Sequence, residues 1–392
     1  MIAAREPSQR PHDARLLVVD RRGHIAERPR AFWTEVLAAS DVVVANDAAT
    51  LPASLSGTHV ASGASIELRL AARRSLDLDD IASWTAVVFG AGDWRTRTEH
   101  RPPPPPLAVG DRLALGPLTA EVAAVLGHPR LVTVRFDATP AAFWQGLTEH
   151  GRVVQYAHLA APLALWDMQT PIAARPVAFE PPSAGFAVDW RSIRALRARG
   201  IRFVTLTHAA GLSSTGDYAL DARLPLPEAY AIPAATARAI AAARCAGGRI
   251  VAIGTTVVRA LEAAASRDGI VRTGTGLADV YVDAAFRLRV VDVLLTGTHE
   301  VGTSHHALLR AFVGADTLER IDDSLERGQF RTHEFGDSVF VERTHDRRFA
   351  TRGRRFERER VSRLPCPCRS TSRTRRCCPD RPWRLRSRPR YR

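Results

Sequence analysis

Apolar residues along the chain occur in short runs separated by turn-forming residues, and the character of these runs changes near residues 57 and 156. Before residue 57, apolar runs at 15–20 and 41–45 predict two strands, and residues 31–39 between them predict a helix. These elements indicate the beginning of a domain with buried strands.

A second kind of pattern fills residues 57–156. Its apolar runs are short and bounded by turn residues, which is typical of a small antiparallel sheet or barrel. Arg101 precedes five consecutive prolines, which predict a stiff exposed loop, or alternatively a polyproline ligand for a partner protein. The predicted strands cover residues 65–70, 85–88, 112–115, 118–125 and 131–136.

From residue 157 onward, predicted strands alternate with predicted helices. This alternation indicates an α/β sheet with parallel strand pairs. The predicted strands are 201–207, 249–253, 280–282 and 288–295, and the predicted helices are 189–199, 234–246, 257–265 and 307–313.

Composition places the chain among globular proteins, with 45% hydrophobic and 24% charged residues. No run of 18 apolar residues predicts a membrane span, and the N-terminal residues lack the apolar core of a secretory signal. Cys245 is the only cysteine before residue 343, which argues against a disulfide framework and favours a cytoplasmic protein.

The net charge of +14 belongs to the C-terminal segment, 343–392. This segment contains 19 Arg and 4 acidic residues, a net +15, which leaves −1 for residues 1–342. Its few apolar residues predict an Arg-rich tail that does not order itself. Three interpretations stay open: a frame-shifted translation of GC-rich DNA, an arginine-rich arm for nucleic acid, and a cysteine metal site.

The clearest site-like feature is Gly254-Thr255-Thr256, between a predicted strand and a predicted helix. Free backbone N–H groups at such a helix N-terminus favour an anionic or polar ligand group. The alternative is an ordinary helix cap, with Arg259 and Glu262 forming an i,i+3 pair.

Other candidate residues also follow predicted strands or lie in loops. Asn46 and Asp47 end the strand at 41–45, either as an Asx turn or as donors of a carboxylate to a ribose or ammonium group. Gly185 allows a close backbone approach. His299 precedes His305 and His306, but this spacing does not match H-E-x-x-H, so we predict no metal site.

No G-x-G-x-x-G, Walker A or G-x-S-x-G motif is present in the sequence, which disfavours nicotinamide cofactors, ATP and a hydrolase nucleophile elbow. Ordered segments nevertheless resemble the S-adenosylmethionine:tRNA ribosyltransferase-isomerase family of queuosine biosynthesis. Their order and spacing carry the resemblance, which runs from about Arg15 to Val341. The main segments are Arg15-Leu16-Leu17-Val18, Asn46-Asp47, Gly110-Asp111-Arg112-Leu113, Gln169-Thr170, Ala184-Gly185, Gly247-Gly248-Arg249, Gly254-Thr255-Thr256 with Arg259 and Glu262, and Arg289-Val290-Val291-Asp292 with Thr296 and His299.

The resemblance implies an α/β fold: a mixed-sheet domain from residues 1–56 and 157–342, with an inserted antiparallel β-barrel at 57–156. It implies transfer of the ribosyl moiety of S-adenosylmethionine to 7-aminomethyl-7-deazaguanine in a tRNA anticodon. The ribose rearranges to an epoxycyclopentanediol, giving epoxyqueuosine and releasing adenine and methionine. S-adenosylmethionine is then a cosubstrate and tRNA the partner. We expect no permanently bound cofactor, no membrane contact, and a cytoplasmic monomer.

Several loop residues differ from the family's motifs, whereas strand and helix residues match. Ala49 and Ser54 stand where the family has arginines, Ala187 replaces a His, and Gly302 replaces a Lys. Since function concentrates on loops, an alternative is a catalytically altered paralogue that binds or acts on another small molecule.

We predict that the candidate residues meet in one pocket at the carboxyl edge of the α/β sheet, since several of them follow predicted strands. His299 and Asp47 are the predicted catalytic residues, because an unperturbed His titrates near neutral pH. The predicted S-adenosylmethionine-binding residues are Asn46, Gly185, Thr255, Thr256 and Arg259.

Overall fold

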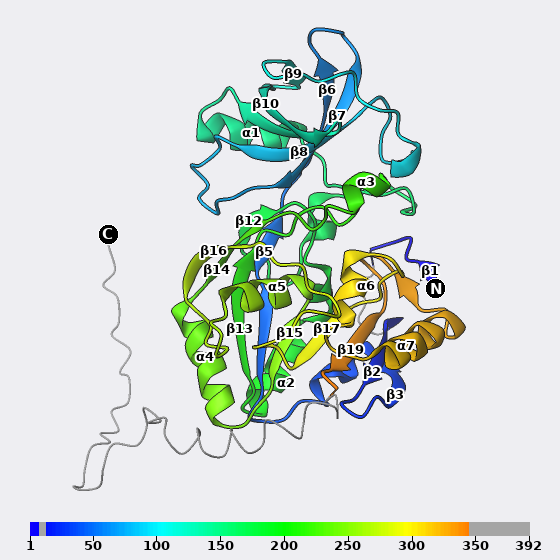
Figure 1. Ribbon diagram of the computed structural model, residues 1–392, viewed down its shortest axis with the longest axis vertical. Helices are drawn as coiled ribbons and strands as arrows, with labels where there is room; N and C mark the ends of the chain where they lie inside the picture. Colours follow the sequence, from blue (N-terminus) through cyan, green and yellow to red (C-terminus); the bar gives the residue numbers. More distant parts are fainter. Residues whose placement is uncertain (8–12, 345–392) are drawn as a thin grey trace, which may run out of the picture. The chain divides into compact units, whose positions relative to one another are not determined.

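The computed structural model describes residues 1–7 and 13–344 (Figure 1). The three interpretations of the Arg-rich tail therefore concern residues that lie, apart from Arg343 and Thr344, outside the described residues.

A nine-stranded mixed sheet forms the α/β part of the molecule (Figure 1). Four neighbouring strands at its centre run parallel, and the next strand on each side runs antiparallel to them. In spatial order the strands are β16 (Gly274–Ala278), β14 (Glu228–Ile232), β13 (Arg202–His208), β4 (Val42–Asn46), β15 (Ile250–Ile253), β17 (Val293–Gly297), β19 (Ser338–Glu342), β2 (Arg15–Val19) and β3 (Ile25–Pro29).

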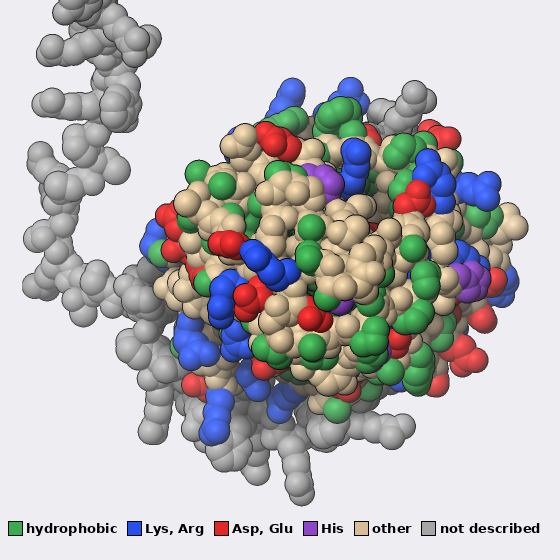
Figure 2. Space-filling view, turned by 90° about the horizontal axis from the view of Figure 1, so that it is seen from above, with side chains coloured by type: hydrophobic (Ala, Val, Ile, Leu, Met, Phe, Trp, Pro, Cys, Tyr) green, Lys and Arg blue, Asp and Glu red, His purple; other side chains and the backbone are tan. Residues whose placement is uncertain are grey.

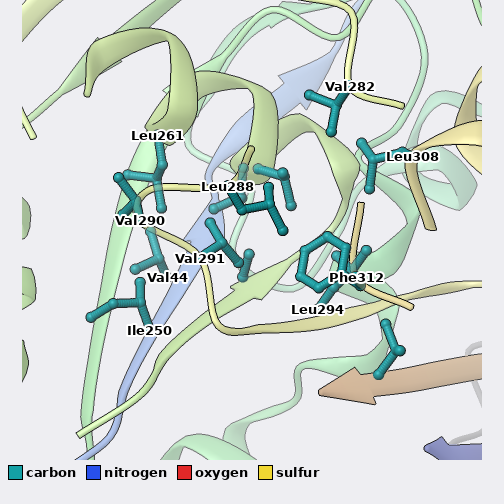
Figure 3. Packing of buried hydrophobic residues seen from close by; sticks show 14 of the residues in the cluster. Val44, Ile250, Leu261, Val282, Leu288, Val290, Val291, Leu294, Leu308 and Phe312 are labelled. Atoms are coloured by element: carbon teal, nitrogen blue, oxygen red, sulfur yellow. The ribbon is translucent and has the colours of Figure 1, made fainter. Parts of the chain in front are cut away.

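Helices cover both faces of this sheet, so its central strands read as continuous apolar runs. All five residues of β4 are buried. One face packs against α4 (Ala234–Cys245), α5 (Thr255–Ala264), α6 (Ser304–Leu309) and α7 (Ala315–Arg327), and Figure 3 shows Val44, Ile250 and Leu294 in this cluster. The other face packs against α2 (Trp190–Ala198).

Six strands close into an antiparallel barrel, which confirms the predicted fold class. In order around the barrel they are β10 (Leu118–His128), β11 (Leu131–Phe136), β8 (Trp84–Phe89), β7 (Ser65–Ala72), β6 (Ser54–His59) and β9 (Arg112–Leu115). The barrel strands thus begin at Ser54, and the domain boundaries at 57 and 156 stay a prediction.

Helix α1 (Pro140–His150) follows the barrel, and the strand-like pattern of the surrounding segment hid it. The Oγ1 of Thr139 accepts the N–H of Ala142 at 3.3 Å, and proline stands in the first turn. The ring of Phe143 stacks on Trp84 with centroids 5.2 Å apart.

A buried group of charges surrounds Glu67, on the face of β7 opposite the apolar barrel core that contains Ile66, Leu68 and Leu70. The Nε of Arg69 donates to Glu67 Oε1 at 2.6 Å, Arg101 pairs with Oε2, and Ser54 Oγ donates to Oε1 at 2.8 Å. Arg101 also donates to Gly90 O at 2.8 Å, so it fixes the start of the proline segment to the barrel wall.

The proline segment is fastened along the barrel. The carbonyl of Pro102 accepts the N–H of Gly90 at 3.0 Å and Arg130 Nη1 at 3.2 Å. Pro104 is buried, whereas Pro102, Pro103 and Pro106 are exposed. The proline segment is therefore bound along the barrel with one side exposed. Its alternative role as a polyproline ligand for a partner protein stays a prediction.

The helix predicted at 31–39 is wrong: only a short 3₁₀ helix, Arg30–Thr34, forms there. The residues that follow make hydrogen bonds to side chains instead of continuing the helix. Arg199 donates to Thr34 O and to Leu37 O, both at 2.5 Å, while the Asp41 carboxylate accepts the N–H of Ala38 at 2.8 Å.

The strand predicted at 288–295 begins only at Val293. The carboxylate of Glu262 accepts the N–H groups of Arg289, Val290 and Val291 at 2.8, 2.9 and 3.0 Å. Those groups are consequently unavailable for strand pairing.

Three further boundaries differ from prediction. The helix expected at 257–265 begins two residues earlier, residues 280–282 form no strand, and the helix expected at 307–313 is α6, which ends at Leu309. The sequence analysis missed helix α7 and the two antiparallel neighbours β14 and β16.

Candidate active site

A cavity of about 890 Å³ opens at the carboxyl ends of the parallel strands. Its walls come from the first turn of α5, from the segments after β13 and β17, from the loop after β12 (Arg175–Ala178), and from barrel residues Arg97, Thr98 and Glu99. Pockets of this size and position are typical of small-molecule sites in α/β proteins.

The N-terminus of α5 faces this cavity. Gly254 is its N-cap, with φ +94°, and no side chain caps the helix. Thr255 and Thr256 both line the cavity. An uncapped helix N-terminus presents N–H donors and a partial positive charge, so this wall suits an anionic ligand group.

Asn46 lies immediately behind that wall. Its Nδ2 donates to His208 O at 2.9 Å and to Thr256 Oγ1 at 3.3 Å, and its Oδ1 accepts the N–H of His208 at 2.9 Å. Asn46 does not line the cavity. Its amide instead joins the ends of β4 and β13 and orients Thr256.

Two other predicted residues also lie outside the cavity lining. The carboxylate of Asp47 accepts the hydroxyls of Thr205 at 2.8 Å and Thr207 at 2.6 Å, so it is occupied within the fold. Gly185 is buried against Thr170, whose Cγ2 would lie 2.9 Å from an added Cβ. Gly185 thus permits close packing of the cavity wall.

Arg259 lines the cavity, but its donors are bound within the protein. It pairs with the buried Glu228 carboxylate and donates to Ala278 O at 2.8 Å and Leu226 O at 3.2 Å. Burial lowers the pKa of Arg259 to about 10. Arg259 therefore fastens α5 to the antiparallel strand pair of β14 and β16, whereas one interpretation of the sequence paired it with Glu262.

His299 lies in the cavity wall, with its Nε2 2.7 Å from Thr296 Oγ1 and its ring 4.9 Å from that of His305. Burial, followed by His305, His306 and His333, holds its pKa well below the ordinary value. Burial and Arg259 lower the pKa of His305 to about 4. The expectation of an unperturbed His299 is wrong: both rings are neutral at neutral pH.

A carboxyl group that the sequence analysis missed lies in the same cavity. Glu180 accepts the hydroxyl of Tyr156 and the N–H of Ser213, the latter at 3.0 Å. Burial raises the pKa of Glu180 to about 7 and that of Tyr156 well above its ordinary value. The sequence did hold one signal for this residue, because Glu180 is a charged residue directly after the apolar run 177–179.

A third group of titratable side chains completes the wall. His158 stacks on His333 at 4.0 Å between centroids, and its Nε2 lies 3.3 Å from Glu334 Oε2. Burial acts to raise the pKa of Glu334, but the hydrogen bond and charge of His158 outweigh it, so the pKa is lowered. His333 has φ +68°, a strained conformation for a non-glycine residue of the kind found at functional sites.

Two further features bear on the classes of function. Within residues 1–7 and 13–344, no group of three or more His, Cys, Asp or Glu side chains is arranged to hold a metal ion. The helices of that part of the chain are all too short or too polar to span a bilayer.

Comparison with known proteins gives consistent results. The profile of a family described as Queuosine biosynthesis protein matches residues 1–341. The S-adenosylmethionine:tRNA ribosyltransferase-isomerase of Sorangium cellulosum is 33% identical over 368 aligned residues, covering 87% of this chain and 95% of that protein. The enzyme of the same name from Thermosynechococcus vestitus is 32% identical, covering 84% of this chain and 90% of that protein.

A solved structure, the S-adenosylmethionine tRNA ribosyltransferase of Thermotoga maritima, covers 87% of this chain and 96% of its own, with 22% identity and a TM-score of 0.46. The family profile spans nearly all of the described residues, and the resemblance found in the sequence is thereby confirmed. On these grounds the chain belongs to the Queuosine biosynthesis protein family.

Proposed function

We propose that this protein is a transferase-isomerase that moves the ribosyl moiety of S-adenosylmethionine onto 7-aminomethyl-7-deazaguanine in tRNA, giving epoxyqueuosine. The shared name of its relatives supplies the activity and both substrates. The observation that carries the proposal is the cavity of about 890 Å³ onto which the uncapped N-terminus of α5 opens. Its position suits a small cosubstrate and one extruded base.

The cosubstrate's only anionic group is its methionine carboxylate, and we assign this group to the N-terminus of α5. Thr255 and Thr256 then supply hydroxyls beside the backbone N–H donors. Asn46 positions Thr256. Gly185 and Arg259 support this wall without contacting the ligand.

The atom balance of the reaction sets the protons that the cavity must handle. An aminomethyl group that enters as ammonium has three N–H bonds and leaves with one, and the ribosyl group loses one C–H hydrogen. Adenine gains one N–H, while the electron pair of the broken C–S bond leaves with methionine. Two protons are released in total, so the cavity needs proton acceptors. A neutral His299 suits that task better than proton donation.

We propose that the tRNA enters where the barrel meets the loop after β13. Tyr218, on α3 (Tyr218–Asp221), lines the cavity and is 92% exposed. An exposed aromatic ring is a stacking surface for an unpaired base. An added Cβ at Gly216 would lie 2.4 Å from Glu99 N, so this loop sits directly against the barrel.

The distribution of charge on the surface agrees with a protein that contacts few of the tRNA phosphates. On the face shown in Figure 2, Arg and acidic side chains are interspersed with apolar ones. This mixture fits the net charge of −1 over residues 1–342. We therefore expect a weak dependence of tRNA affinity on salt, because few phosphates are neutralised.

The direct test incubates the purified full chain with S-adenosylmethionine and a tRNA that carries 7-aminomethyl-7-deazaguanine. Adenine release by chromatography and the mass gain of the modified nucleoside are the two measurements. A tRNA with unmodified guanine at that position is the control and should release no adenine. Binding of S-adenosylmethionine without adenine release from the precursor-bearing tRNA would instead favour the altered paralogue.

We also propose that no cofactor stays bound between turnovers, that the active species is a monomer, and that the tRNA substrate places the reaction in the cytoplasm. Light scattering coupled to size-exclusion chromatography tests the oligomeric state. Absorbance and mass analysis of the denatured protein tests for a retained small molecule.

A further inference from the structure

Glu180 is an unusual carboxyl group for a cavity wall. It is only 7% exposed, yet it lines the cavity. Its two oxygens accept hydrogen bonds from Tyr156 and Ser213, and the structure shows no cation paired with it in the described residues. A buried carboxylate without a cationic partner is costly, so a structural role alone does not account for it.

We propose that Glu180 is the base that binds the ammonium form of the acceptor's aminomethyl group and takes a proton from it. The inference rests on the proposed function, because the aminomethyl group belongs to that reaction's acceptor. A primary alkyl ammonium ordinarily loses its proton near the lysine pKa of about 10.4, so at neutral pH its nitrogen lacks a free lone pair. Transfer to Glu180 frees that lone pair for the new C–N bond, and the carboxyl group then passes the proton to water.

The surroundings of Glu180 place its titration where such a base works best. Burial raises its pKa and Glu334 raises it further, whereas the bonds from Tyr156 and Ser213 lower it, with a net value of about 7. His158 contacts Glu334 and stacks on Tyr156, and Arg69 lies 5.8 Å from the Tyr156 ring centroid. A base with a pKa near the working pH combines availability with proton affinity.

The test is the pH profile of kcat/KM for adenine release with the precursor-bearing tRNA. For the unmodified protein the profile should rise with pH through a midpoint near pH 7 and level off at higher pH. Glu180→Gln should lower kcat/KM at pH 7 by about 10²–10⁴-fold, a typical loss for a proton-transfer group. The profile of this variant should lack the midpoint near pH 7 and should keep rising toward pH 9, as free amine accumulates.

Substitutions at two residues near Glu180 should shift the pH profile of kcat/KM, which a purely structural role of Glu180 would not produce. Tyr156→Phe removes a bond that stabilises the charged carboxylate, so the rising limb should move to higher pH. Glu334→Gln removes a repelling charge, so the limb should move to lower pH. Thermal melting of all three variants checks that the fold is retained.

The outcomes separate this inference from the proposed function. If the unmodified protein releases no adenine, the proposed function fails. If it is active and Glu180→Gln retains a limb near pH 7, Glu180 is structural and the inference is overturned. If calorimetry shows that Glu180→Gln loses affinity for S-adenosylmethionine, Glu180 binds the cosubstrate's cation, which overturns it as well. Unchanged affinity together with opposite limb shifts supports the inference.

Discussion

The Nδ2 of Asn46 lies 3.3 Å from the hydroxyl oxygen of Thr256, across 210 positions of sequence. Asn46 ends β4 and Thr256 belongs to the first turn of α5. Since the same amide also bonds both backbone groups of His208, the Thr256 hydroxyl has a fixed orientation at the cavity wall.

Thr256→Val should weaken the binding of S-adenosylmethionine, because it removes that hydroxyl at nearly constant volume. Loss of one hydrogen bond of about 1 kcal/mol corresponds to a roughly fivefold higher Kd. Isothermal titration calorimetry measures it. Thr205→Val is the matched control, since its hydroxyl bonds Asp47 behind the wall, and its Kd should stay unchanged. Equal affinities for the Thr256 variant and the unmodified protein would contradict the assignment.

Arg259→Ala should act mainly on stability. The substitution leaves the buried Glu228 carboxylate without its cation, which typically costs about 3–5 kcal/mol of unfolding free energy. Urea denaturation measures that loss. Replacing both partners, as Arg259→Met with Glu228→Leu, should cost much less, since no unpaired charge remains. A loss below about 1 kcal/mol for the single variant would contradict a large cost of leaving the Glu228 carboxylate unpaired.

Buried histidines should make the protein less stable in mild acid. The folded-state pKa of His305 is about 4, below the unfolded value of 6.5. Between these values the unfolded chain binds a proton that the folded protein does not, so the unfolding free energy falls as pH falls from 6.5 toward 4. His208 and His299 act in the same direction, and the raised pKa of Glu180 acts in the opposite one.

Denaturation of His305→Asn at several pH values isolates one such group. Its unfolding free energy should fall less steeply with acid than that of the unmodified protein, by at most about 1.4 kcal/mol per pH unit. Above pH 7.5 the difference between the two proteins should be constant. Parallel curves throughout the acid range would mean that His305 takes up a proton in the folded state.

Glu67→Gln should destabilise the barrel. It removes the only carboxylate shared by Arg69 and Arg101, among the described residues, and leaves both guanidinium groups buried. The expected loss is about 3–5 kcal/mol of unfolding free energy. Glu121→Gln, at an exposed position on β10, is the control and should change stability by less than about 0.5 kcal/mol. A similar small effect for both variants would contradict the importance of this charge cluster.

Local sequence determined much of the secondary structure. The apolar runs at β4 and β15 are unambiguous because every residue of these two strands is buried. Turn residues between short runs likewise indicated the antiparallel barrel. The position of Thr255 and Thr256 at a helix N-terminus also followed from neighbouring residues, with an error of two positions in the helix start.

Tertiary structure alone decided which polar groups meet. The Glu262 carboxylate binds the N–H groups of residues 289–291, so these residues do not join the strand that follows them. Arg259 pairs with Glu228 and not with Glu262. The fold brings Tyr156 to Glu180, although 24 positions separate them. It also buries His299, and this burial lowers the pKa of that residue. Hydrophobic periodicity is a local property of the chain, whereas hydrogen-bond partners and burial depend on the whole packed fold, so no local pattern specified them.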